Sequence, residues 1–188
     1  GMVHNGVSPH KEAIKAINEI SKINKDYILL TNAPRPNYAV KSFLEKLGIE
    51  KKIREHVFTS GEAALNYLKK NLLDAPFFHV GPPKDFDLFD NFKNNKIESI
   101  ENCEYILCTG LFDEHDKDLK YYKKLFDNKL KKKMICTNPD LIVDRGNQRE
   151  LCAGSVAMVF EKMGGEVVYF GKPYPEVYNQ SFNNKNKK

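Results

Sequence analysis

The sequence predicts an α/β fold in which a mostly parallel sheet is covered by helices on both faces. Short apolar runs alternate along the 188 residues with segments whose apolar positions recur at helical spacing, and this alternation is typical of strands joined by crossover helices. Runs such as Tyr105 to Cys108 are too short to be helices. Several of them end in glycine or a small polar residue, as expected where a strand stops at a turn.

Local signals place the individual elements. Ser8 and Pro9 suit the N-cap and first turn of a helix, its apolar residues follow from Ala13 to Ile20, and Gly48 suits the end of the next helix. We expect strands at 27–30, 56–59, 77–80, 105–108, 133–136 and 167–170, and helices at 8–20, 38–47, 60–68, 119–130 and 154–163.

Composition and charge narrow the class of protein. Hydrophobic residues make up 41% and charged residues 29% of the chain, a balance that can build an apolar core. No apolar run approaches the roughly 20 residues that span a membrane. The first residues also lack the apolar stretch of a signal peptide. We therefore expect a cytoplasmic protein with no membrane partner.

The positive charge and the cysteines indicate no further chemistry. Much of the net charge of +5 lies in Lys129 to Lys133 and Lys185 to Lys188. These runs could attract nucleic acid or phosphate, but no aromatic residues interleave with them to stack bases. We favour solvated lysines and expect no nucleic-acid partner. The four cysteines form no C-x-x-C pair, so we expect small buried side chains rather than a zinc site.

Polar residues at the expected strand ends point to a ligand. Thr31-Asn32, Thr137-Asn138 and Gly171-Lys172 each follow an apolar run. In doubly wound parallel sheets ligands bind at the carboxyl ends of the strands. Hydroxyls, amides and a lysine at that edge suit an anion such as phosphate, although Thr-Asn and Gly-Lys pairs are also ordinary turn chemistry.

Three segments in order resemble motifs of the haloacid dehalogenase superfamily. Residues 31–35 read TNAPR, similar to the second motif of its cap-bearing class. Residues 136–140 read CTNPD and are followed by LCAG at 151–154, similar to the return from the cap to the core. Residues 169–175 read YFGKPYP, similar to the third motif. The resemblance spans residues 3–182 and is closest to the NagD-like subclass IIA.

The resemblance implies a fold and an activity. The expected fold is a parallel, Rossmann-like core, incomplete here, with an inserted α/β cap. Residues 1–59 and 150–182 would form the core, 60–149 the cap and 183–188 a disordered tail. The implied activity is a magnesium-dependent phosphatase of small phosphorylated metabolites. In that family an aspartate attacks phosphorus, and cap-mediated dimers are common, so a homo-oligomer is possible.

The resemblance also implies roles for individual residues. The Thr31 hydroxyl and the main-chain N–H of Asn32 would bind phosphate oxygens, and Lys172 would supply a balancing charge. Asn138 and Asp140 would lie near the mouth of the site or form a simple turn. The roles of two further groups of residues stay open. Arg35 would contact an acidic substrate group or cap a helix, and Gly81, Pro82, Thr109 and Gly110 are candidate cap contacts.

The sequence departs from the family pattern at two places. The nucleophilic aspartate is expected three residues before Gly1 and is not in the chain, and the fourth motif is expected where residues 183–188 read NNKNKK. Asp26, Asp140 and Asp144 are expected on the wrong elements to replace these carboxylates. We therefore expect a fragment that is inactive by itself and holds no metal. The alternative is a non-catalytic remnant or a phosphate-binding module that needs a partner chain.

Overall fold

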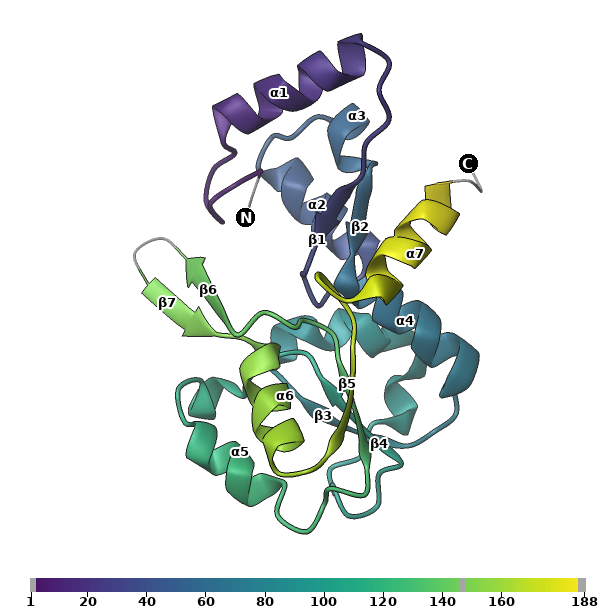
Figure 1. Cartoon of the computed structure of the whole chain (residues 1–188), viewed down its shortest axis with the longest axis vertical. Coiled ribbons are helices and arrows are strands. Elements are labelled where there is room, and N and C mark those ends of the chain that lie inside the picture. The colour runs from purple at the N-terminus through teal and green to yellow at the C-terminus, as the bar shows by residue number, and fades with distance from the viewer. Residues whose placement is uncertain (1–2, 146–147, 186–188) are drawn as a thin grey trace.

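The computed structural model describes residues 3–145 and 148–185 (Figure 1). The elements of the first third are α1 (Lys11–Lys22), β1 (Leu29–Thr31), α2 (Asn37–Lys46), α3 (Lys51–Arg54), β2 (Val57–Thr59) and α4 (Ser60–Asn71). The middle contains β3 (Phe77–Val80), the 3-10 segment η1 (Pro83–Asn95), β4 (Tyr105–Cys108), the short 3-10 turn η2 (Asp113–His115), α5 (Leu119–Leu125) and β5 (Lys133–Cys136). The remainder contains β6 (Ile142–Arg145), β7 (Gln148–Leu151), α6 (Ala153–Lys162), β8 (Glu166–Tyr169) and α7 (Pro175–Lys185).

The strands form two parallel sheets and a hairpin. The larger sheet has the order β3-β4-β5-β8, the smaller one pairs β1 with β2, and both are parallel throughout. An antiparallel hairpin of β6 and β7 projects to one side in Figure 1. This confirms the predicted α/β class with parallel strands. Among the described residues no helix is long and apolar enough to cross a membrane.

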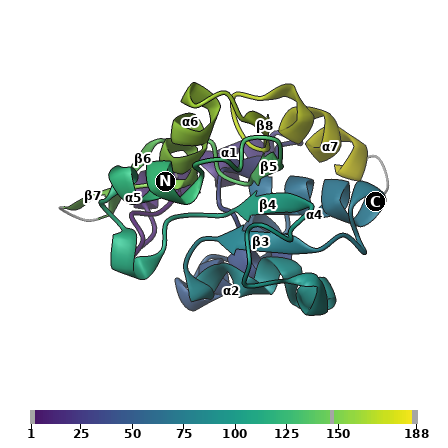
Figure 2. The same ribbon diagram turned by 90° about the horizontal axis from the view of Figure 1, so that it is seen from below.

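Strand alternation gives the larger sheet two apolar faces. Successive side chains of a strand point to opposite faces, so Phe77, Leu107 and Ile135 pack against α4 and η1. Val80, Ile106 and Met134 pack on the other face against α5 and α6, which lie side by side in Figure 2. Helices therefore cover both faces of this sheet, as the sequence predicts.

The smaller sheet has its own core. Ile17 of α1, Leu44 of α2 and Ile53 of α3 are buried together with Val57 of β2. In Figure 1 this unit lies above the larger sheet, and α7 comes back to pack beside α4. The joint between the two units passes through the loop after β1.

The structure draws the boundary of the two units differently from the sequence. We grouped residues 150–182 with residues 1–59, but β8 pairs with β5 and α6 packs against α5 in the larger unit. The alternation of strands and helices predicts that β8 exists but not which sheet it joins. The tail also differs, since residues 183–185 end α7, whereas 186–188 lie outside the described residues.

We expect Phe77→Ala to lower the free energy of unfolding by about 3–5 kcal/mol. Phe77 is fully buried and contacts Phe89, Phe92 and Tyr105, so its removal leaves a cavity between sheet and η1. Urea denaturation followed by circular dichroism measures the change. Phe182→Ala, at a position 60% exposed, is the control and should stay within about 0.5 kcal/mol of the parent.

Candidate functional site

Three strand ends meet at one place in the molecule. Thr31 is the last residue of β1, the loop of Asn138 to Asp140 follows β5, and Gly171-Lys172 follows β8. The structure therefore brings together residues that the sequence proposed for binding phosphate. The contacts that join them come mainly from one side chain, that of Asn32.

The side-chain amide of Asn32 is bonded on both of its ends. Its Oδ1 accepts the main-chain N–H of Lys172 at 2.7 Å, and its Nδ2 donates to the carbonyl of Lys172 at 3.0 Å. The same Nδ2 donates to Oδ1 of Asp140 at 2.8 Å. Asn32 is only 9% exposed, so these bonds satisfy a buried polar group. They link the smaller unit to two strand ends of the larger sheet.

Two glycines allow the close approach of these segments. Gly171 has φ +125°, and a Cβ there would lie 2.6 Å from Cδ of Pro139 and 2.8 Å from Oδ1 of Asn32. A Cβ at Gly154 would lie 2.2 Å from the carbonyl oxygen of Pro139. The loop after β5 is thus held between α6 and the turn after β8, at a spacing that a side chain on either glycine would prevent.

Thr31 and Lys172 keep donors for a ligand. The Thr31 hydroxyl accepts the N–H of Ala33 at 3.3 Å and donates to no described group. Within the described ranges no carboxylate lies within ion-pair distance of the Lys172 ammonium, although its main chain is fixed by Asn32. A hydroxyl proton and an unpaired ammonium at one strand edge are suitable donors for an anion.

The start of α4 holds the loop after β1 through its main chain. Thr59 is the N-cap of α4, since its Oγ1 accepts the N–H of Glu62 at 2.9 Å. That hydroxyl also donates to the carbonyl of Arg35 at 2.6 Å, and Ser60 Oγ donates to the carbonyl of Ala33 at 3.0 Å. The loop that carries the Thr31-Asn32 pair is therefore anchored independently of any ligand.

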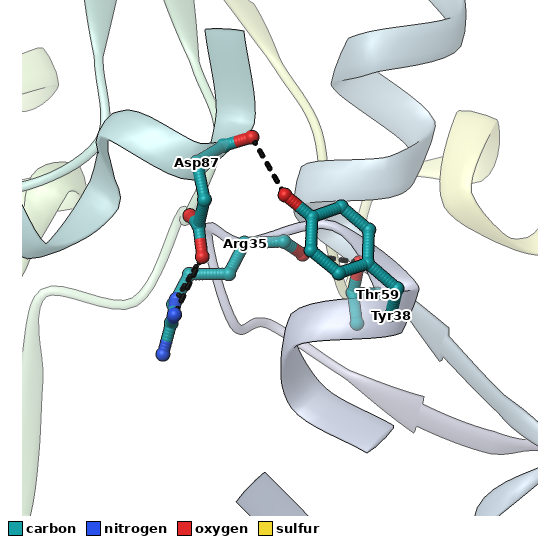
Figure 3. A network of polar contacts seen from close by, with 4 residues as sticks. All are labelled: Arg35, Tyr38, Thr59 and Asp87. Carbon is teal, nitrogen blue, oxygen red and sulfur yellow. Dashed lines mark hydrogen bonds and ion pairs between the residues drawn. The ribbon is translucent and has the colours of Figure 1, made fainter. Parts of the chain in front are cut away.

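The side chain of Arg35 bonds to a carboxylate of η1 in this structure. Its Nε donates to Oδ2 of Asp87 in η1 at 3.0 Å, and a second guanidinium nitrogen pairs with the same oxygen. Tyr38 donates its hydroxyl to the main-chain carbonyl of Asp87 at 3.3 Å (Figure 3). Arg35 thus joins the loop after β1 to the larger unit. Its local contact is a carboxylate of this chain, which the sequence did not indicate.

The four candidate cap contacts are buried. Thr109 is 2% exposed and its Oγ1 lies 2.8 Å from Nε2 of His79. A Cβ at Gly81 would lie 2.1 Å from that Oγ1, and a Cβ at Gly110 would lie 2.8 Å from Cδ of Pro82. These residues pack against one another inside the larger unit, and Gly81 also lines a small surface pocket with His79 and Phe86. Their role as cap contacts stays a prediction.

Burial perturbs two groups next to this packing. Asp85 is 3% exposed, and its burial raises the pKa of its carboxyl from 3.8 to about 6, against the opposing effects of a hydrogen bond from Thr109 and of the Lys84 and Arg35 charges. Burial, with the charge of Lys96, lowers the pKa of His79 to about 3. His79 is therefore neutral near pH 7, and Asp85 carries a charge that the fold accommodates at a cost.

The described residues do not form a magnesium cage. Hard divalent cations take several oxygen ligands, but nowhere in residues 3–145 and 148–185 do three or more acidic, histidine or cysteine side chains gather in a way that could hold a metal. At the site itself Asp140 is the carboxylate that the contacts identify, and its Oδ1 accepts from Asn32. Asp140 thus lies beside Asn32, and whether its carboxylate takes part in any reaction stays a prediction.

Comparison with known proteins agrees with this fold. A family model described as haloacid dehalogenase-like hydrolase matches residues 1–93. A haloacid dehalogenase-like hydrolase from Brucella suis is 27% identical, with a TM-score of 0.89 over 100% of this chain and 71% of that one. The first 93 residues of this chain thus resemble haloacid dehalogenase-like hydrolases in sequence, and the whole chain shares the fold of one such hydrolase. A search of curated proteins found no match.

Two further solved structures share the fold at lower identity. A p-nitrophenyl phosphatase from Archaeoglobus fulgidus is 18% identical with a TM-score of 0.74, over 98% of this chain and 70% of that one. A 4-nitrophenylphosphatase from Thermotoga maritima is 21% identical with a TM-score of 0.74, over 100% and 71%. All three structures are longer than the 188 residues that match them.

We expect Gly171→Ala to destabilise the protein more than Gly164→Ala. Both glycines have positive φ, +125° and +99°, but no atom lies within 4 Å of a Cβ at Gly164. The control, Gly164→Ala, should therefore lower the free energy of unfolding by about 1–2 kcal/mol through backbone strain alone. Gly171→Ala should lower it further, because its Cβ also pushes Pro139 and Asn32 apart. Equal losses in urea denaturation would mean that the segments do not pack as closely as described.

We expect Asp85→Asn to alter how stability depends on pH. The folded-state pKa of about 6 lies above 3.8, so the folded protein holds this proton more tightly and the aspartate's contribution to stability falls as pH rises from about 4 to about 6. The free energy of unfolding of the variant should therefore rise relative to that of the parent over this range, by about 1–3 kcal/mol at pH 8. Urea denaturation from pH 4 to 8 measures the difference, and Asp113→Asn controls for an amide at an exposed position. A constant difference would refute the assignment.

Proposed function

We propose that this chain supplies the phosphate-binding part of a phosphohydrolase that acts on small phosphorylated metabolites. The observation that carries the proposal is the pairing of Asn32 with the main chain of Lys172, which brings the backbone of that lysine next to the end of β1, where Thr31 lies. The names of the phosphatases from Archaeoglobus and Thermotoga support a phosphoester substrate.

In this proposal each group binds the phosphoryl group in a different way. The Thr31 hydroxyl and the main-chain N–H of Asn32 donate to phosphate oxygens, and the Lys172 ammonium offsets their charge. Asn138 and Asp140 order the loop at the mouth, since Oδ1 of Asn138 accepts the N–H of Asp140 at 3.0 Å. Such preorganised donors stabilise charge that redistributes in phosphoryl transfer.

Hydrolysis needs groups beyond these. The resembled superfamily uses an aspartate nucleophile and magnesium, which bridges carboxylate and phosphate. The carboxylate of Asp140 is close to Asn32, but it accepts a hydrogen bond from the Asn32 amide. We therefore propose that the 188-residue polypeptide, taken alone, binds phosphate without hydrolysing phosphoesters.

A second candidate is a phosphate-binding module that a partner chain completes. The observation that favours it is the pairing of β1, which is bonded to β2 alone among the described strands. An open strand edge can pair with another chain. Either candidate is expected to work in the cytoplasm, and a homo-oligomer is compatible with both.

We expect inorganic phosphate to bind this polypeptide through Lys172. Lys172→Ala should weaken binding at least about tenfold, because a charge-assisted bond is lost. Titration followed by 31P NMR measures the affinity, with Lys162→Ala, an exposed lysine of α6, as the matched control. Unchanged affinity in Lys172→Ala would exclude the proposed site.

An aryl phosphate with magnesium tests the second half of the proposal. We expect no turnover above that of the Lys172→Ala variant. Turnover that requires both magnesium and Lys172 would contradict the proposed inactivity and would place the reacting carboxylate in this chain or in a second copy of it.

A further inference from the structure

The main-chain position of Lys172 depends on the side chain of Asn32, to which the proposed function assigns no role in setting the affinity for phosphate. The turn after β8 would be free to move if only its own backbone held it, because Gly171 adopts φ +125° and permits many conformations. What holds the following residue is a side chain from the other unit of the fold. The amide of Asn32 accepts from the N–H and donates to the carbonyl of the same lysine.

We propose that the Asn32 side chain is a positioning residue, which sets where the Lys172 ammonium meets phosphate and ties that position to Asp140. This rests on the proposed function and extends it, since the role given to Asn32 so far is that of its main-chain N–H. The two bonds to Lys172 fix both polar groups of one peptide segment, and the third, to Asp140, holds the loop after β5.

The chemistry of an amide suits this role better than that of other side chains. Contact with an N–H, a carbonyl and a carboxylate at once requires one acceptor and two donors on a short stem, and asparagine provides that set. An aspartate of the same shape would still accept from Lys172 N–H but would turn an oxygen toward the Lys172 carbonyl and the Asp140 carboxylate. Alanine would leave the partly buried N–H and carbonyl of Lys172 without this side-chain partner.

The burial of the Asn32 side chain strengthens its hold on the turn after β8. Asn32 is 9% exposed, and the atoms nearest to a Cβ on Gly171 include its Oδ1 and the ring of Pro139. Water has little access to replace the amide, so the loss of Asn32 moves the turn rather than merely rehydrating it. Asn32→Ala keeps the main-chain N–H that the proposed function uses, which separates the two roles in an experiment.

The test is a double-mutant cycle on phosphate affinity. Inorganic phosphate is titrated by 31P NMR into the full 188-residue chain and its Asn32→Ala, Lys172→Ala and double variants. We expect Asn32→Ala to weaken binding about tenfold, in the range of one bond to a charged group. In the Lys172→Ala background, where Thr31 and the Asn32 N–H still bind weakly, the same change should weaken binding less than about twofold, because residues that act through one another are not additive.

Matched variants separate this role from a general loss of structure. Asn66→Ala also removes an amide that links distant segments, since Asn66 Nδ2 donates to Gln180 Oε1 at 3.0 Å, and it should leave phosphate affinity unchanged. Asn32→Asp is the second variant if Asn32→Ala does not fold. It should retain protection of the Lys172 amide from hydrogen exchange, as the bond to its N–H survives, yet bind phosphate more weakly.

The outcomes distinguish this inference from the proposed function. Parental affinity in Asn32→Ala, with binding lost in Lys172→Ala, would overturn the positioning role and leave the phosphate site intact. Equal losses from Asn32→Ala with and without Lys172 would also overturn it, since the effect would then be independent of the lysine. No phosphate binding by the parent chain would reject the proposed function and the inference together.

Discussion

The polar joint between the two units of this molecule is made chiefly by one side-chain amide, that of Asn32. The two-stranded sheet has a core of its own on one face, while Phe58 and Leu30 of its strands pack into the apolar cluster of the larger unit, and specific polar contacts add a defined orientation to such packing. Asn32 provides three hydrogen bonds across the joint, and the ion pair of Arg35 with Asp87 provides a second connection from the same loop. Both connections depend on the anchoring of that loop by the first turn of α4.

Most strands could be predicted because their signal is local. Runs such as 105–108 and 133–136 are apolar, short and bounded by turn residues, and the structure has strands at those residues. The sheet that β8 joins is decided by packing between distant segments. The spacing of apolar residues along the sequence does not indicate it. The segment η1 is not predicted from the sequence. Its backbone departs from helical geometry at Phe89 and Phe92, so it is not a regular helix with helical spacing of apolar residues. The β6–β7 hairpin is polar and largely exposed, so it lacks the apolar alternation of a buried strand.

The candidate site was predictable to the extent that its residues lie in motifs. Thr31, Asn32 and Lys172 fall at strand ends, and the structure brings their segments together; their roles stay predictions. The contact of Asp87 with Arg35 could not be predicted from the sequence. Asp87 lies in a run of aspartates and phenylalanines, and no local pattern there indicates a partner more than fifty positions away. The same holds for the burial of Thr109, which depends on how His79 and Gly81 pack around it.

The span of the Asn32 contacts has a consequence for synthesis on the ribosome. Asn32 and Lys172 are 140 positions apart along the chain, and loop-closure entropy makes such distant contacts late events in folding. The strands β3 to β5 can pair as they emerge, since each neighbours the next in sequence order. The Asn32 bonds cannot form until the turn after β8 has left the exit tunnel, whereas the ion pair of Arg35 with Asp87 can form as soon as η1 has emerged. During translation the loop after β1 is therefore held to the larger unit first by a charged pair and only at the end by the amide.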